Sequence, residues 1–273
     1  MKILSFDAFT LKWIAVIGMI ANHVAIGLAS VLPLWLMFIL YGAGGLTYVI
    51  MAYFVVEGYK YTRNLKKYIG RLLIFGLIAQ AFHPTVLGVT NVMGGPIFLN
   101  ILFTIILSLL VLLMYDKIKI RVLFWLLFIV ACVVAMFMDL FFVGVLVPLL
   151  YYTIKKESRR RTLSGVVSGL LFGIMGLFVA LLPIIYFTTG EMAEEMKQQV
   201  YQSGMTAELM LVMPSFAIGC FLGAILIRNY NGERGKPAKW LFYIVYPTHL
   251  AIIALIAVLL GVTSFNLFGF ISF

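Results

Sequence analysis

Residues 33–56 read PLWLMFILYGAGGLTYVIMAYFVV and contain no charged side chain. An α-helix needs about 20 mainly apolar residues to cross the ~30 Å hydrocarbon core of a bilayer, so this stretch is long enough to span a membrane. The rest of the chain has the same character, since 64% of its 273 residues are hydrophobic and 11% are charged. A soluble domain would have roughly 25% charged residues, and the composition therefore excludes a soluble globular protein.

Apolar runs of this kind recur along the whole chain. The fifth and sixth runs are short and are separated only by Met138 and Asp139, so they are either a tight hairpin of two spans or two half-membrane segments. The sequence predicts one all-α, polytopic membrane domain over residues 1–273, with about nine transmembrane helices. The candidate spans are residues 9–30, 33–57, 71–89, 97–115, 122–137, 140–154, 163–187, 207–227 and 240–262.

The charged residues between the runs indicate the orientation of the chain. With nine spans, four basic loops and the amino terminus fall on one side, whereas the long loop at about 188–206 falls on the other and carries Lys197 among several glutamates. Basic loops are retained in the cytoplasm. We therefore expect a cytoplasmic amino terminus and an external carboxyl terminus. The net charge of +10 arises from these loops and does not indicate nucleic-acid binding.

The cysteine and histidine spacings do not suggest a metal site. Cys132 and Cys220 each lie inside an apolar run, and neither belongs to a CxxC or Cys/His pattern. The histidines are far apart in the sequence and show no ligand spacing on a helix. We therefore expect two buried thiols and no metal, and we expect His83, which precedes Pro84, to lie near the outer surface.

Ionisable residues inside the predicted spans are the candidates for chemistry, because they are energetically costly in a membrane. Lys12 and His23 are eleven residues apart, which is about three helical turns, so they share a helix face and are separated by about 16 Å along the axis. His249 lies near the middle of the last span, just after Pro247, which loosens the helix. Glu57 ends the second span.

Structural explanations of these residues stand beside the functional ones. A single intramembrane histidine often only forms a hydrogen bond to a neighbouring helix. Lys12 could extend to the headgroups, and the basic loops could serve only to set the topology. Glu57 could be an ion-pair partner of Arg63 or Arg71. Two histidines at matching depth, with a lysine in register, favour a functional site.

Four stretches of the chain carry a family resemblance: LKWIAVIGMIANHVA (11–25), EGYKYTRNLKKYIGRLLIFGLIAQ (57–80), LNILFT (99–104) and FYIVYPTHL (242–250). They resemble the TraX family, membrane proteins named for the acetylase of F-type conjugative pilin. The first-helix spacing of Lys12 and His23 is also similar to the signature of the type 3 membrane acyltransferases, which move acyl groups from cytoplasmic acyl-CoA to acceptors outside. Members usually have Asp before this histidine, where the present chain has Asn22.

The resemblance implies an acetyl-CoA-dependent acetyltransferase in a bacterial cytoplasmic membrane. Its acceptor would be an amine or hydroxyl of a pilin-like peptide, a glycan or a lipid at the outer face. In this hypothesis Lys12, Arg63 and Arg71 bind the CoA phosphates, His23 is the general base, and His249 is a second catalytic group. The candidates for contact with the acceptor are Asn22, Glu57, Tyr243 and Tyr246.

Two other functions are compatible with the same residues. A small proton-linked transporter could use the two histidines to line a path, but we see none of the internal repeats that many transporter folds contain. A membrane assembly factor of a conjugation or export system would need no catalytic group. Acyl transfer that is lost when His23 is replaced would favour the enzyme, and solute flux without CoA consumption would favour the transporter.

Overall fold

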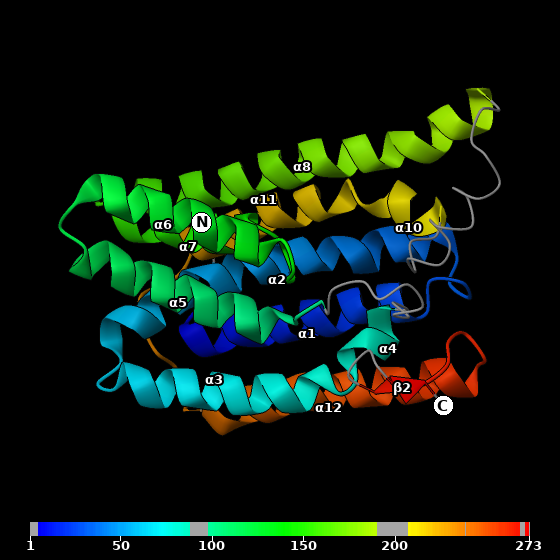
Figure 1. Ribbon diagram of the computed structural model, residues 1–273, viewed down its shortest axis with the longest axis horizontal. Helices are drawn as coiled ribbons and strands as arrows, with labels where there is room; N and C mark the ends of the chain where they lie inside the picture. Colours follow the sequence, from blue (N-terminus) through cyan, green and yellow to red (C-terminus); the bar gives the residue numbers. More distant parts are fainter. Residues whose placement is uncertain (1–4, 88–97, 190–206, 238, 268–270, 273) are drawn as a thin grey trace.

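The computed structural model describes residues 5–87, 98–189, 207–237, 239–267 and 271–272. It confirms the all-α prediction, because long helices lie side by side as a bundle (Figure 1) and the strands of the described chain are the two-residue β1 (Asn266–Leu267) and β2 (Ile271–Ser272). The helices are α1 (Ala8–Gly27), α2 (Leu34–Tyr61), α3 (Leu65–Gln80), α4 (His83–Leu87), α5 (Ile101–Lys117), α6 (Arg121–Ala135), α7 (Val143–Thr153), α8 (Glu157–Thr189), α10 (Ala207–Val212), α11 (Ser215–Arg228) and α12 (Lys239–Leu259).

Several of these helices are long and apolar enough to cross a membrane, so the protein is a multi-pass membrane protein. Within the described residues five segments meet this criterion, and α6 and α7 are shorter apolar helices. The count of nine crossings stays a prediction. The five segments are Ala8–Gly27, Leu34–Tyr61, Glu157–Leu181, Leu209–Arg228 and Phe242–Leu259.

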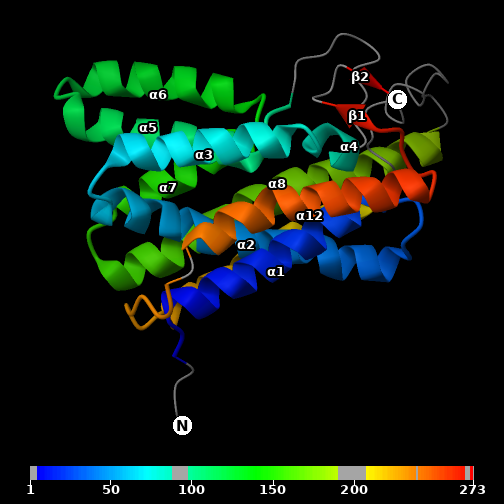
Figure 2. The ribbon, with the colours of Figure 1, turned by 90° about the horizontal axis from the view of Figure 1, so that it is seen from below.

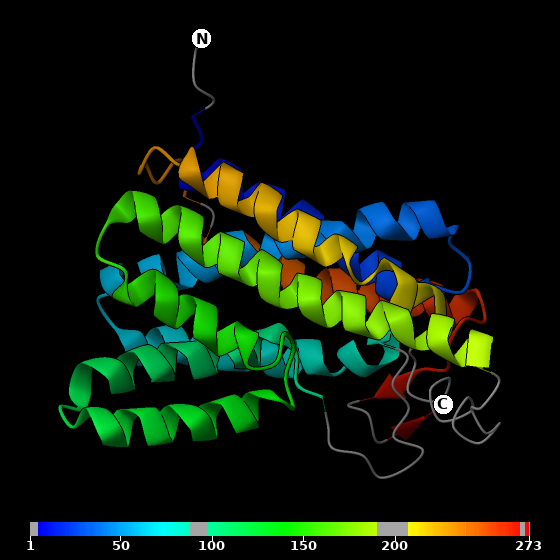
Figure 3. The same cartoon turned by 90° about the horizontal axis from the view of Figure 1, so that it is seen from above.

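The basic turns of the chain gather at one end of the bundle. Figures 1, 2 and 3 place the start of α1 and the α2–α3, α5–α6, α7–α8 and α11–α12 connections at this end, which we call the basic end. The last helix, α12, runs from the basic end toward the opposite end of the bundle (Figure 1). Which end faces the cytoplasm stays a prediction, and residues 190–206 of the predicted external loop lie outside the described chain.

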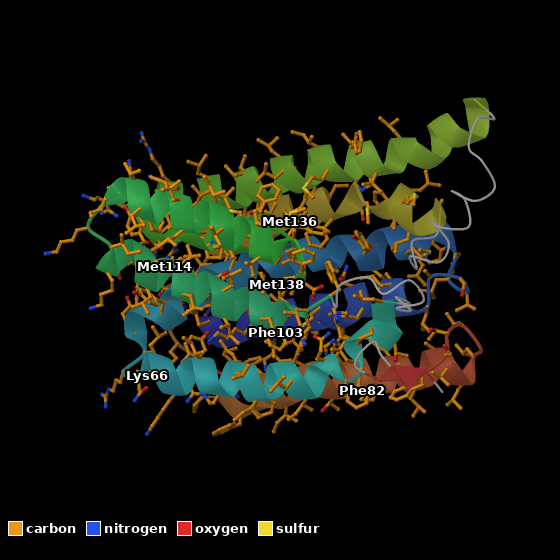
Figure 4. The ribbon with its side chains drawn as sticks, viewed as in Figure 1. Lys66, Phe82, Phe103, Met114, Met136 and Met138 are labelled. Atoms are coloured by element: carbon orange, nitrogen blue, oxygen red, sulfur yellow. The ribbon has the colours of Figure 1, made fainter. Side chains whose placement is uncertain are left out.

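Helices α6 and α7 form a hairpin that does not reach the far end of the bundle. With 15 and 11 residues, they are about 22 Å and 17 Å long, which is shorter than the hydrocarbon core and fits the half-membrane alternative. Their turn lies part-way along the molecule, where Figure 4 labels Met136 and Met138. Leu140 and Phe141 have φ angles of 67° and 49°, a left-handed conformation that is unfavourable for large side chains.

Backbone groups at this depth need partners, because a bilayer offers none. The backbone groups of the α6–α7 turn form hydrogen bonds with residues just before and within α5. The N–H of Leu99 donates to the carbonyl of Phe137 at 2.9 Å, and the N–H of Asp139 donates to the carbonyl of Leu99 at 3.0 Å. The hydroxyl of Thr104 donates to the carbonyl of Asp139 at 2.9 Å. The turn is therefore fixed in place, with Asp139 at its centre.

Glycines bring α2, α11 and α8 into close contact. A Cβ atom at Gly219 of α11 would overlap the carbonyl of Gly42 on α2, and one at Gly45 would overlap the carbonyl of Phe216. Small residues at helix contacts are a common way to pack helices in membranes, where apolar burial alone gives little driving force. We call this contact of α2 with α11 the glycine interface. On its other side α11 packs against Gly165 of α8.

Candidate functional site

The two histidines that the sequence placed at matching depth are in contact. His23 of α1 and His249 of α12 are both buried, and Nδ1 of His23 lies 3.1 Å from Nε2 of His249. Their ring centroids are 4.9 Å apart. The two helices lie next to each other (Figure 2), so residues at opposite ends of the sequence form one site. We call His23 and His249 the histidine pair.

The hydrogen bonds of the pair define its tautomers. Nδ1 of His249 lies 2.9 Å from the carbonyl of Val245, and a carbonyl can only accept, so this nitrogen carries the proton of the neutral ring. Nε2 of His249 is then an acceptor, and Nδ1 of His23 must be the donor. That N–H of His23 also faces the carbonyl of Met19 at 2.9 Å. Nε2 of His23 consequently bears a lone pair and can accept a proton from a substrate.

His83 is the third histidine of the chain, and it joins the same region. The expectation that it lies near the outer surface was wrong, because its side chain is 0% exposed. The short helix α4 packs against both α1 and α12. Nε2 of His83 lies 3.2 Å from Oδ2 of Asp139, and both residues are within electrostatic range of His23. No pattern in the sequence indicated burial at this position, since His-Pro at the end of a span is typical of a loop.

The two tyrosine candidates, Tyr246 and Tyr243, lie one turn apart on α12. The ring of Tyr246 lies 6.3 Å from that of His23 and 5.5 Å from that of His249, and the residue is buried. Tyr243 lies one turn closer to the basic end and stacks on Phe75 of α3 at 5.3 Å. Tyr246 is therefore beside the proposed base, whereas Tyr243 is farther along the helix.

Asn22 lies at the contact of α1 with α2. Its side-chain N–H donates to the carbonyl of Tyr41 at 3.1 Å, and its amide occupies the space that the absent side chain of Gly44 leaves. In this arrangement the amide donates a hydrogen bond that a carboxylate could not donate. Asn22 therefore serves to join α1 to α2.

The predicted phosphate ligands lie toward the basic end and differ in their surroundings. Nζ of Lys12 lies 4.8 Å from the ring centroid of Phe54 and is within electrostatic range of Arg234 in the α11–α12 connection. The guanidinium of Arg71 lies 5.8 Å from the ring of Tyr243, and its buried Nε makes no hydrogen bond in the described chain. Arg63 is exposed. Lys12 and Arg71 are the partly buried cations of the three.

Glu57 forms an ion pair with a residue that the sequence did not single out. The expected partners were Arg63 or Arg71, but the carboxylate lies 3.4 Å from Arg160 of α8. Arg160 also binds Glu157 at 2.5 Å. The partner could not be found from sequence, because it is more than a hundred positions away. Glu57 is thus part of a network that joins α2 to α8.

Two further polar residues were missed, although both lie in the stretches that carry the family resemblance. Asn100 donates from Nδ2 to Oε1 of Gln80 at 2.9 Å and to the carbonyl of Gly76 at 2.8 Å, and its backbone N–H donates to the same Gln80 oxygen at 3.0 Å. Gln80 donates to the carbonyl of Phe98 at 2.8 Å. These bonds fix the start of α5 against α3. The available signal was that each is a polar residue inside an apolar run of the sequence.

The part of the chain that the structure describes contains no group of three or more His, Cys, Asp or Glu side chains with a geometry that could hold a metal ion. The chemistry that this arrangement can support is proton transfer. Nε2 of His23 can take up a proton, while its own N–H is held by two acceptors. Lys12 lies nearer the basic end on the same helix as His23, and Tyr246 of α12 lies beside the His23 ring.

Comparisons with known proteins identify relatives of the chain. A protein-family model described as "TraX protein" matches residues 8–257. The chain is 29% identical over 262 residues, or 92% of its own length and 95% of the relative's, to the "Probable fimbrial assembly protein FimC, serogroup H1" of Dichelobacter nodosus. No solved structure matches the chain.

Proposed function

Since the chain belongs to the TraX family, we propose that it is a membrane-embedded acetyltransferase of the bacterial cytoplasmic membrane. It moves an acetyl group from cytoplasmic acetyl-CoA to an amine or hydroxyl of an acceptor at the outer face. The observation that carries the proposal is the histidine pair, in which the 3.1 Å contact leaves Nε2 of His23 free to act as a base. An uncharged imidazole with an available ring nitrogen suits the removal of a proton from such an acceptor.

The reaction divides into steps that these residues can support. The acceptor nitrogen or oxygen attacks the thioester carbon, and its proton passes to Nε2 of His23. The C–S bond then breaks, and the CoA sulfur takes the proton back from His23. While His23 is charged, its N–H donates to Nε2 of His249 and to the carbonyl of Met19. His249 thus holds the ring in one tautomer and orientation, as the third member of a catalytic triad does.

The donor binds from the basic end in this proposal. Lys12 and Arg234 are two cations within electrostatic range of each other, and like charges that lie close together favour an anion between them. Lys12 and His23 lie about 16 Å apart along α1. Phosphates near Lys12 would therefore leave the thioester to extend toward the histidine pair. Arg71, stacked near Tyr243, is the second candidate for the phosphates, and Arg63 is the third.

The surroundings of the pair support transfer to the acceptor in preference to water. His23 and His249 are buried among α1, α4 and α12, and a site that excludes water protects a thioester from hydrolysis. Tyr246 is the leading candidate for a hydrogen bond to the acceptor, because its ring is buried and lies beside both histidines. Asn22 and Glu57 act indirectly, through the helices that they join.

The name of the Dichelobacter nodosus relative supports a second candidate function. That protein is called a probable fimbrial assembly protein, so the present chain could act in the assembly of a pilus or fimbria without catalysis. The two functions are compatible if the acceptor is a pilin. They differ in whether the histidine pair turns over a substrate.

The experiment that tests the proposal measures acetyl-CoA binding and slow hydrolysis by the purified protein in detergent. We expect Lys12→Ala to weaken binding about tenfold, since one charged contact to phosphate is worth about 1.4 kcal/mol or more. We expect His23→Ala to bind normally and to lose about 10³-fold in turnover. Lys66→Ala is the matched control, because Lys66 is exposed at the same end of the bundle (Figure 4).

Wild-type protein that binds no acetyl-CoA would overturn the acetyltransferase and leave the assembly role. Turnover that survives in His23→Ala would overturn the mechanism. Solute flux into proteoliposomes without CoA consumption would favour a transporter.

A further inference from the structure

Asp139 is an unusual residue for its position. It is the only charged residue between Arg121 and Lys155, and it lies in the turn between the apolar helices α6 and α7. A carboxylate inside a membrane protein is costly unless it has a partner or a function. The turn that carries it contains two left-handed residues, and such strained conformations are concentrated at functional sites. The structure thus holds a carboxylate where none is needed to make a turn.

The surroundings of Asp139 connect it to the histidine pair. Its carboxylate lies 3.2 Å from Nε2 of His83 on α4. It is also within electrostatic range of His23 on α1, Tyr41 on α2 and Tyr246 on α12. Side chains of three helices that are far apart in the sequence, α1, α2 and α12, therefore lie within electrostatic range of the Asp139 carboxylate. Both ring nitrogens of His83 are buried and neither makes a hydrogen bond in the described chain, so Nε2 approaches the Asp139 carboxylate without a well-aligned hydrogen bond.

We propose that Asp139 and His83 are positioning residues for the histidine pair, and that the Asp139 carboxylate stabilises the His23 imidazolium that forms during acetyl transfer. This inference rests on the proposed function. The proton balance is simple. A proton that moves from the acceptor to Nε2 of His23 gives the pair one positive charge, and the Asp139 carboxylate is the acidic group placed to balance it. The charge disappears again when the CoA sulfur takes the proton.

The competing explanation is that Asp139 and His83 only attach α4 to the α6–α7 turn. Both explanations predict that removal of either residue lowers stability. They differ in whether the effect reaches His23 and His249. Only a functional coupling changes the state of the pair while the fold is retained.

The composition of the chain allows a direct test, because its three histidines are all in this region. Protein labelled with ¹⁵N-histidine, purified without a histidine tag, gives side-chain NMR signals from this site alone. Single His→Gln variants assign the signals. In Asp139→Asn we expect the signals of His23 and His249 to move as well as that of His83. Thr104→Val is the control, because it removes a hydrogen bond to the Asp139 carbonyl and keeps the carboxylate. It should leave the signals of His23 and His249 in place.

Kinetics give the second readout. We expect Asp139→Asn to lower kcat of acetyl-CoA turnover about tenfold with KM unchanged, and Asp139→Glu to restore part of the loss. In the His23→Ala background, Asp139→Asn should have no further effect on turnover. A loss of equal size in both backgrounds would overturn the inference.

The NMR result separates this inference from the proposed function. If only the His83 signal moves in Asp139→Asn, the coupling is absent and the inference is wrong, whether or not the protein turns over acetyl-CoA. If the signals of the pair move but wild type shows no turnover, the coupling stands and the acetyltransferase is wrong. Should Asp139→Asn fail to fold, His83→Gln repeats the test, since unmoved His23 and His249 signals there would equally overturn the inference.

Discussion

The glycine interface and the histidine pair are two helix contacts of opposite character within one bundle. Where α2 meets α11, side chains are absent and the backbones approach so closely that a Cβ atom at Gly219 would meet a carbonyl. Where α1 meets α12, imidazoles fill the contact and form hydrogen bonds with each other and with their own helices. The first contact gains from dispersion between closely packed atoms. The second gives up close packing for polar groups that can exchange a proton.

The contact of α2 with α11 thus serves the stability of the bundle, whereas the contact of α1 with α12 serves its chemistry. A substitution in the glycine interface should therefore change the stability of the protein. A substitution in the histidine pair should change acetyl transfer.

The largest expected effect is on stability, for Gly219→Ala. The added Cβ cannot fit without a shift of the α2 backbone, and such overpacking costs about 3 kcal/mol. Unfolding in detergent, followed by circular dichroism, measures the loss. Gly70→Ala is the control, because a Cβ there meets nothing within 4 Å, and alanine in a helix should stabilise by about 0.5–1 kcal/mol. Equal stability of the two variants would show that the glycine interface is looser than described.

The second-largest expected effect is on the rate of acetyl transfer, for the variant His249→Ala. The N–H of His23 keeps its bond to the Met19 carbonyl, so we expect the fold to survive and stability to change by less than about 1 kcal/mol. Turnover of acetyl-CoA should fall about 100-fold, because the ring that holds the His23 tautomer is gone. Unfolding of this variant would break the comparison, since the histidine pair would then be a structural contact.

The smallest effect is expected for Asn22→Ala, at the boundary of the two regions. Asn22 is next to the proposed base in sequence, but its hydrogen bond is to α2. We expect a stability loss of about 1 kcal/mol and a change in turnover below about threefold. A loss of turnover as large as that of His249→Ala would assign Asn22 to the chemical region and move the boundary of our comparison.

Much of the fold could be predicted from the sequence, because apolar run length reflects the thickness of the bilayer. The first two runs and the last correspond to α1, α2 and α12 within a few residues. The short fifth and sixth runs are the hairpin of α6 and α7. The contacts between helices could not be predicted, since periodicity fixes the face and depth of a side chain but not its neighbour. The matching depth of His23 and His249 was therefore predictable, but their contact was not.

The remaining site residues were missed for the same reason. Burial of His83 depends on the packing of α4 against α1 and α12, whereas local sequence around Pro84 favours a loop. Asp139 was seen only as a break between two runs, because its partner His83 is on another helix. Arg160 was counted among the basic residues of a loop, although it begins a network with Glu57. In each case a long-range contact decides what the residue does.

The glycine interface also has a consequence for how the protein is made. Its two helices, α2 and α11, are separated by more than half of the chain. At about 5–20 residues per second, ribosomes would deliver α11 to the membrane on the order of ten seconds or more after α2. During that interval lipid chains must cover the groove of α2. A chain that ends before α11 would keep this groove open, so membrane proteases could distinguish an unfinished copy from a finished one.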